Sequence, residues 1–335
     1  MTQSASNKPR YTYIDRTKGL AILLVVLGHL IAREGPPGEG AGWYVLLKHG
    51  IYAFHMPLFM AVSGLVYGLS WRPRATVGED LADAKRRALR LLPAYLLFGL
   101  VIFFGKLAFQ SFTAGVDNRV EGAGDLLELV TQPTASFCSF LWYIYALAVL
   151  YLVFPLAFRA VRGRVAVLLP ITVAFWWLPT SAWFAWDRLQ ALSVFFVLGV
   201  LAGRHHEAAQ RWLGRLWLPA MLPFVAVLPA AAQGYPWARN VAAASAVLAL
   251  PGLIRWAQRA PLAWLETLGR YTLIIYLTNT IFIGLVKVGS IQLGLWHASN
   301  FWAIAAVMSL VATVGPILLK RHLLPRVPPL DRITT

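Results

Sequence analysis

The sequence has a single cysteine, Cys138, and few charged residues, since Asp, Glu, Lys and Arg together make up only 13% of its 335 residues. One cysteine cannot form an intramolecular disulfide, and it leaves no zinc-type cysteine spacing. The sequence also lacks a phosphate-binding P-loop, a GxSxG nucleophile motif and an HExxH pair. A soluble domain carries about 25% charged residues. The scarcity of charge therefore excludes an ordinary soluble protein.

Hydrophobic residues make up 59% of the chain, which includes 14 tryptophans. A run of about 20 apolar residues is needed to cross a bilayer as a helix. The sequence predicts an all-α integral membrane protein with about ten transmembrane helices, embedded in the cell (cytoplasmic) membrane. The predicted spans lie at about 17–33, 44–70, 89–109, 137–158, 165–182, 187–203, 212–232, 237–256, 268–288 and 299–320.

The net charge of +16 is large enough for a nucleic-acid-binding protein, but its distribution indicates a membrane protein. With the N-terminus placed in the cytoplasm, 23 of the 30 Lys and Arg residues fall on the cytoplasmic side, whereas the 14 acidic residues divide equally. This bias is the one expected of membrane proteins. We therefore predict both termini in the cytoplasm and no nucleic-acid partner. The predicted parts are a cytoplasmic arm (1–16), a transmembrane domain (17–320) and a cytoplasmic tail (321–335), with residues 110–136 as an external loop or cap.

The stretch "YIDRTKGLAILLVVLGHL", residues 13–30, combines charge with a hydrophobic run. Lys18 and His29 are eleven residues apart, so on a helix they share a face and stand about 16 Å apart along the axis. They are too far apart to form a catalytic dyad. An imidazole is the usual proton acceptor near neutral pH, and ionisable groups inside membranes are usually functional. We predict His29 as a buried base; the alternative is a hydrogen bond to a neighbouring helix. For Lys18 the alternative is an anchor at the cytoplasmic surface.

Two further stretches carry unusual polar residues. In "FHMPLFMAVSGLVYG", residues 54–68, His55 falls in the outer half of the second span. Two histidines at similar depth invite a metal site, but no carboxylate or cysteine lies nearby, so we predict no metal. In "KRRALRLLPAYLL", residues 85–97, Arg87 and Arg90 are spaced by three at the cytoplasmic side of the third span. Guanidinium groups bind phosphate in bidentate fashion, although simple anchoring explains the spacing as well.

Six segments together resemble the membrane-bound acyltransferase 3 family, closest to its fucose-4-O-acetylase-like branch. They are "IDRTKGLAILLVVLGH", "FHMPLFMAVSG", "RALRLLPAYLL", "LWYIYALAVLYLV", "FFVLGVLAG" and "LGRYTLIIYL", in the family's order. The resemblance as a whole covers the chain from about 11 to 320. The resemblance implies a ten-helix membrane enzyme. Such enzymes transfer an acyl group, usually acetyl from cytoplasmic acetyl-CoA, to a hydroxyl group of a sugar or related acceptor.

The resemblance also implies roles for single residues. His29 matches the family's catalytic histidine in the first helix, and Lys18 matches the basic residue eleven positions before it. Arg87 and Arg90 match an RxxR pair that handles the CoA donor. Trp142 matches the "LWY" position of the fourth span and is predicted to help bind the donor. Asn279 stands where many members carry histidine, which argues against a proton-transfer role at that position.

Composition, topology and resemblance together predict an O-acetyltransferase that moves acetyl from acetyl-CoA to a sugar or glycoconjugate. The pantetheine arm spans on the order of 15–20 Å, which is close to the Lys18–His29 rise. We therefore expect the nucleotide near Lys18, Arg87 and Arg90 and the thioester near His29. We expect His55 or Asn279 to bind the acceptor or polarise the carbonyl. The alternative function is a proton-coupled saccharide transporter, because buried histidines also serve proton relays.

Overall fold

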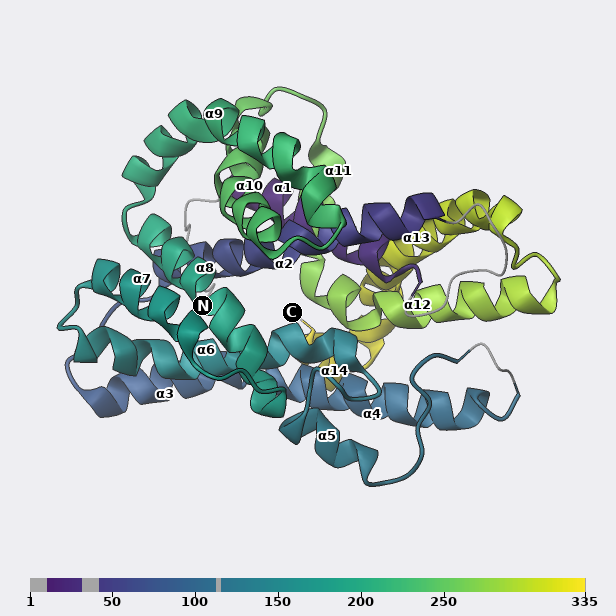
Figure 1. The fold of residues 1–335 in the computed structure, drawn as a ribbon. Helices are drawn as coiled ribbons and strands as arrows, with labels where there is room; N and C mark the ends of the chain where they lie inside the picture. Colours follow the sequence, from purple (N-terminus) through teal and green to yellow (C-terminus); the bar gives the residue numbers. More distant parts are fainter. Residues whose placement is uncertain (1–10, 32–41, 113–115, 335) are drawn as a thin grey trace, which may run out of the picture.

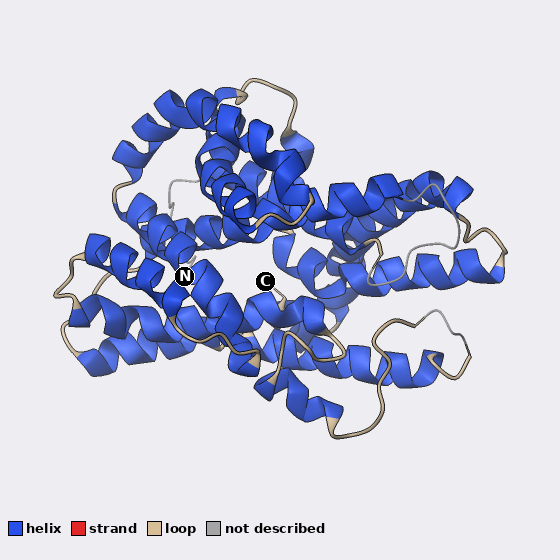
Figure 2. Ribbon diagram, in the orientation of Figure 1, coloured by secondary structure: helices blue, strands red, loops and turns tan. Residues whose placement is uncertain are grey.

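A computed structural model describes residues 11–31, 42–112 and 116–334 of the chain. All of its regular elements in these ranges are helices, joined by short loops (Figure 2). The α-helices are α1 Thr12–His29, α2 Gly42–Ser70, α3 Val77–Ala88, α4 Leu92–Phe109, α5 Asp125–Thr131, α6 Trp142–Ala160, α7 Val165–Ala174, α8 Trp186–Arg204, α9 His206–Ala232, α10 Pro236–Trp256, α11 Ala263–Arg270, α12 Thr272–Gln292, α13 Phe301–Leu318 and α14 Pro328–Ile333 (Figure 1). The predicted all-helical fold class is confirmed.

Eight helical stretches among the described residues are long and apolar enough to cross a membrane. They contain α2, α4, α6, α8, α9, α10, α12 and α13. The other two predicted spans correspond to α1 and to α7. The first turns of α1 carry Asp15, Arg16 and Lys18, which lower its hydropathy. Helix α7 is only ten residues long and gives way to a short 3-10 turn at Phe175–Trp177. Leu178 is extended there, as expected before a proline, Pro179.

Glycines set the packing of α2 against α8. A Cβ atom on Gly64 of α2 would overlap the carbonyl oxygen of Phe196, and one on Gly199 of α8 would overlap that of Ala61. Gly68 and Gly203 stand four residues further along each helix. They make equivalent close contacts one turn on, with the carbonyl oxygens of Val200 and Leu65. Small residues spaced by four allow two helix backbones to touch. The two helices therefore form a fixed pair, and α2 carries His55.

Ion pairs stabilise the end of the bundle where α1 begins, which we call the Lys18 end. Asp80, which is fully buried, binds Arg159 of α6 through Oδ2 and Nε at 2.6 Å. Asp83, also buried, pairs with Arg86 and with Arg87. The Asp80–Arg159 pair ties α3 to α6, and all three pairs satisfy buried carboxylates.

Residues 116–141 cross the opposite end, called the His29 end, and include α5. The ammonium group of Lys106, from α4, donates to the carbonyl oxygens of Asp117, Asn118 and Phe137 at 2.7, 2.9 and 2.7 Å. Lys287 of α12 binds the Asp117 carboxylate at 2.8 Å. The segment is thus held by both α4 and α12.

Candidate active site

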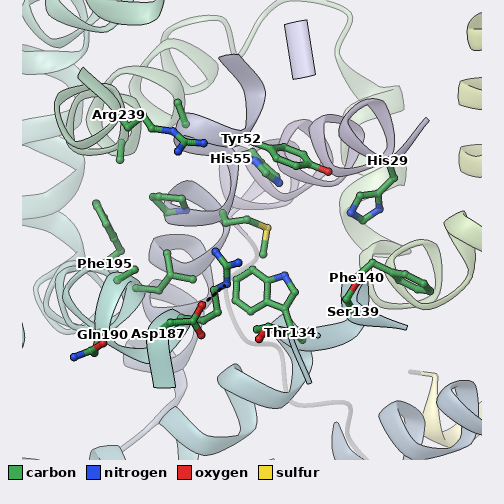
Figure 3. Close-up of a pocket in the computed structure, with 18 of the residues that line it drawn as sticks. His29, Tyr52, His55, Thr134, Ser139, Phe140, Asp187, Gln190, Phe195 and Arg239 are labelled. Carbon is green, nitrogen blue, oxygen red and sulfur yellow. Dashed lines mark ion pairs between the residues drawn. The ribbon is translucent and has the colours of Figure 1, made fainter. Parts of the chain in front are cut away.

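A cavity of about 740 Å³ at the His29 end gathers polar residues from several helices. His29 comes from α1, His55 from α2, Trp142 from α6 and Gln190 from α8. Figure 3 shows His29 on one side of this space, Gln190 and Phe195 on the other, and Tyr52 beside His55 between them. The cavity therefore brings together two histidines predicted from the sequence.

His29 is held by Asn279, a fully buried residue of α12. Nδ1 of His29 lies 3.0 Å from Oδ1 of Asn279. The Asn279 amide nitrogen donates to the carbonyl oxygens of Ile275 and Tyr276 at 2.9 and 2.8 Å, which turns Oδ1 toward the imidazole. A carboxamide oxygen only accepts hydrogen bonds, so Nδ1 must carry the proton. In a neutral imidazole this leaves Nε2 as the basic nitrogen.

Side chains of α2 fix the end of α1 where His29 stands. Tyr44 and Tyr52 donate to the carbonyl oxygens of Leu27 and Gly28 at 2.8 and 2.9 Å. Lys48, one turn from each, donates to the carbonyl oxygen of Ile31 at 2.5 Å. The last carbonyls of a helix have no partner within that helix. The spacing of four along α2 therefore supplies donors for this helix end and positions the imidazole.

His55 is buried and bound to its own helix. Its Nδ1 donates to the carbonyl oxygen of Ile51 at 2.8 Å, because a main-chain carbonyl only accepts. The ring stacks on Tyr52 with centroids 5.0 Å apart. His55 thus has the same tautomer as His29, with Nε2 as its acceptor nitrogen, and both residues line the cavity.

The rest of the cavity wall is aromatic and polar. Trp142, predicted as a donor-binding residue, begins α6 and lies under the guanidinium of Arg188, with Cζ 5.2 Å from the ring centroid. Sequence reasoning missed the other members of this wall, because they stand alone on loops and helix ends without a repeating pattern. They include Asn118, Thr134, Ser139, Trp176, Asp187, Arg188, Gln190, Arg239 and Asn240.

A second cavity, of about 720 Å³, lies between α4 and α12. It is lined mainly by apolar side chains such as Ile102, Phe109 and Ile283. Four residues line both cavities: His29, Asn118, Phe140 and Thr280. The hydroxyl oxygen of Thr280 is buried and has no hydrogen-bond partner among the described residues. The predicted base therefore stands where a polar and an apolar cavity meet.

The predicted donor-binding cations lie at the other end of the bundle, and neither of these two cavities includes Lys18, Arg87 or Arg90 among its described lining residues. Lys18 pairs with Asp15 at 2.9 Å. Arg87 belongs to α3, donates to Asp83 and to Ser70, and lies over the ring of Tyr67.

Arg90 is exposed and stands in the turn between α3 and α4. The helix breaks at this turn because Pro93 occupies the first turn of α4, where its missing N–H costs nothing. Arg87 and Arg90 therefore do not share one helix face, although their sequence spacing suggests it.

No group of three or more His, Cys, Asp or Glu residues suited to a metal ion occurs within residues 11–31, 42–112 and 116–334. His29 and His55 each use one ring nitrogen for a hydrogen bond to the protein. The arrangement is that of two imidazole bases facing a shared cavity.

Comparison with known proteins bears on this site. A family model described as an acyltransferase domain (acyltransferase 3) matches residues 11–321. The nodulation protein NolL of Mesorhizobium japonicum is 32% identical over 143 residues, which is 42% of this chain and 34% of that protein. NolL of Sinorhizobium fredii is 38% identical over 120 residues, 34% of this chain and 31% of that protein. The matches thus span about a third of each relative. No solved structure matches the chain.

Proposed function

The chain belongs to the acyltransferase 3 family, and on that premise we propose that it moves an acetyl group from acetyl-CoA to a hydroxyl group of a sugar or glycoconjugate. The observation that carries the proposal is the His29–Asn279 hydrogen bond beside a polar cavity. It leaves Nε2 of His29 basic, as a general base requires. The buried histidines alone would also fit a proton-coupled saccharide transporter. Membership of an acyltransferase family favours the enzyme over that alternative.

In the proposed reaction, Nε2 of His29 takes the proton of the acceptor hydroxyl as its oxygen attacks the thioester carbonyl. The new C–O bond forms and the C–S bond breaks, and the leaving thiolate takes the proton back from His29. Asn279 positions the imidazole and fixes its tautomer, as the third member of a catalytic triad does. The unpartnered Thr280 hydroxyl and His55 both line the polar cavity, where they are available to bind the carbonyl oxygen or the acceptor.

We place the nucleotide of acetyl-CoA at the Lys18 end, on the cytoplasmic side of the cell membrane. Arg90 fits a phosphate best of the three predicted cations, because it is exposed, whereas Lys18 and Arg87 already hold carboxylates. The pantetheine arm would cover the rise of about 16 Å to His29. The acceptor sugar would occupy the polar cavity, where Trp142 and Trp176 offer apolar faces next to Arg188 and Asp187.

The direct test uses purified protein in nanodiscs, acetyl-CoA and a panel of methyl glycosides. We expect release of free CoA that depends on the glycoside, and a product heavier by one acetyl group in mass spectrometry. If no glycoside accelerates CoA release above hydrolysis, the assignment of a sugar acceptor is wrong.

Rapid quench with labelled acetyl-CoA in the absence of acceptor separates two mechanisms. Direct attack assisted by a general base leaves no label on the protein. Label recovered on His29 would instead establish an acetyl-histidine intermediate and remove the direct mechanism.

A further inference from the structure

The apolar cavity between α4 and α12 has no role in the proposed transfer of an acetyl group. Its wall extends along α12 from Thr280 to Gln292, a rise of about 18 Å. Its margin includes Phe112 and Leu285, whose side chains are 83% and 53% exposed. Helices α4 and α12 belong to two of the stretches able to cross a membrane, so this margin opens toward the lipid.

Three glycines line this cavity: Gly105 on α4, and Gly284 and Gly289 on α12. Gly64 and Gly199 are required by helix packing, but a Cβ added to any of these three would meet no atom within 4 Å. Glycine within a helix destabilises that helix relative to alanine. Helix packing offers no reason for that cost here, and what the three glycines do is keep the cavity wide.

The apolar cavity is also continuous with the catalytic residues. His29, Phe140 and Thr280 belong to its wall and to that of the polar cavity. A molecule that fills both must be polar at one end and apolar at the other, with the reacting hydroxyl near the junction. An acetyl group is too small to use a space of about 720 Å³.

We propose that the apolar cavity binds the hydrocarbon chain of a lipid-linked acceptor, whose sugar occupies the polar cavity and presents its hydroxyl to His29. This rests on the proposed acyltransferase function and adds the class of acceptor, a glycolipid. The length of the cavity suits on the order of a dozen methylene groups. The gap between α4 and α12 lets the acceptor enter from the bilayer.

The test compares a methyl glycoside with the decyl glycoside of the same sugar, below its micelle concentration, in nanodiscs. Burial of each methylene strengthens binding about fourfold. We expect the decyl glycoside to show a KM at least about tenfold lower. Gly284→Leu and Gly105→Leu place a side chain in the cavity from opposite helices and favour helix formation. In either variant the ratio of kcat/KM for decyl over methyl should fall toward one.

Gly78→Leu is the matched control. Gly78 is a helical glycine of α3 with open space around its Cβ position, and it lines neither cavity. Its ratio should stay at the wild-type value. Partition of the decyl chain into the nanodisc is the same for every variant, so a fall confined to the two cavity variants excludes partition as the cause. Variants at Gly284 and Gly105 that keep the full ratio would overturn the proposal.

Two further measurements identify the source of the chain. With a methyl glycoside as acceptor, octanoyl-CoA and acetyl-CoA are compared in wild type and in Gly284→Leu. If Gly284→Leu lowers kcat/KM for octanoyl-CoA but not for acetyl-CoA, the cavity binds the acyl chain of the donor, and the proposal is overturned. Equilibrium binding of labelled decyl glycoside to the same proteins does not depend on turnover. Binding that is weakened by Gly284→Leu supports the chain site even if no transfer occurs, whereas absence of binding refutes it.

Discussion

The two ends of the helical bundle treat charge in opposite ways. At the Lys18 end, arginines and lysines are paired with buried carboxylates, as in Asp80 with Arg159. At the His29 end, Lys106 and Lys48 are bound to main-chain carbonyl oxygens, and polar side chains line a hollow. Ion pairs with buried carboxylates stabilise the Lys18 end, while at the His29 end cations that bind main-chain carbonyl oxygens leave an open space beside a histidine. The comparison teaches that the partner a cation takes, and not the amount of charge, distinguishes the packing of the two ends.

The largest expected effect concerns the base itself. His29→Gln removes the proton acceptor while keeping a polar side chain of similar size. General base catalysis contributes roughly 10²- to 10⁴-fold, so we expect kcat to fall by about that factor. Binding of acetyl-CoA, measured by calorimetry, should stay near the wild-type value, because we place the nucleotide at the other end. Turnover within about threefold of wild type would show that His29 is not the base.

The second expected effect tests the partner of the base. Asn279→Leu removes the acceptor that holds the Nδ1 proton of His29, so we expect kcat to fall about tenfold to a hundredfold. The pH profile of kcat should also change, because the imidazole tautomer is no longer fixed. Asn279→His, which supplies another polar ring, should restore part of the activity.

Thr278→Val is the control for that variant. Thr278 is buried in the same turn of α12 and bonds only the carbonyl oxygen of Ile274, at 2.7 Å. The Thr278→Val variant should lose some stability but keep the wild-type pH profile of kcat. A profile that shifts equally in both variants would mean that Asn279 acts through helix stability alone.

The third expected effect compares two lysines, one at each end. Lys106→Met removes the ammonium that holds residues 117, 118 and 137, and Asn118 lies in the wall of both cavities. We expect KM for the acceptor to rise about fivefold to twentyfold with little change in KM for acetyl-CoA.

Lys320→Met is its counterpart at the Lys18 end. Lys320 also binds several acceptors, including Asp331 at 2.8 Å and Thr334 at 3.0 Å. This variant should lower the melting temperature without a selective change in acceptor KM. A rise in acceptor KM in both variants would mean that a general loss of stability explains it.

The smallest expected effect concerns the arginine pair. Arg90→Gln should raise KM for acetyl-CoA about threefold to tenfold, more at low salt than at high salt, and leave stability unchanged. Arg87→Gln should chiefly lower the melting temperature, because Arg87 supports Asp83 and Ser70. If Arg90→Gln leaves KM for acetyl-CoA unchanged at low salt, the nucleotide lies elsewhere.

The sequence predicted the helical class and the positions of the eight stretches long and apolar enough to cross a membrane among the described residues, because long apolar runs admit few other structures. It also predicted that His29 and His55 lie near one another, since both fall at similar depth on adjacent spans. Those parts depend on local pattern and on helix geometry, which a sequence carries directly.

Other parts depend on contacts between distant segments. The His29–Asn279 hydrogen bond joins residues 250 positions apart, and no periodicity signals it. The wall residues Asn118 and Gln190 reach the cavity only because a loop and a helix end are anchored there. The spacing of Arg87 and Arg90 does not reveal that the helix break before Pro93 places them in different elements.

The interlocked glycines of α2 and α8 have a consequence for how this enzyme can diversify. Because backbone meets backbone along that seam, a larger side chain there would part the helices and move His55. Helix α4 and residues 116–141 line the cavities beside His29 without such a seam. New acceptor preferences should therefore arise most readily in α4 and in that segment, and directed evolution for altered specificity should randomise these positions first.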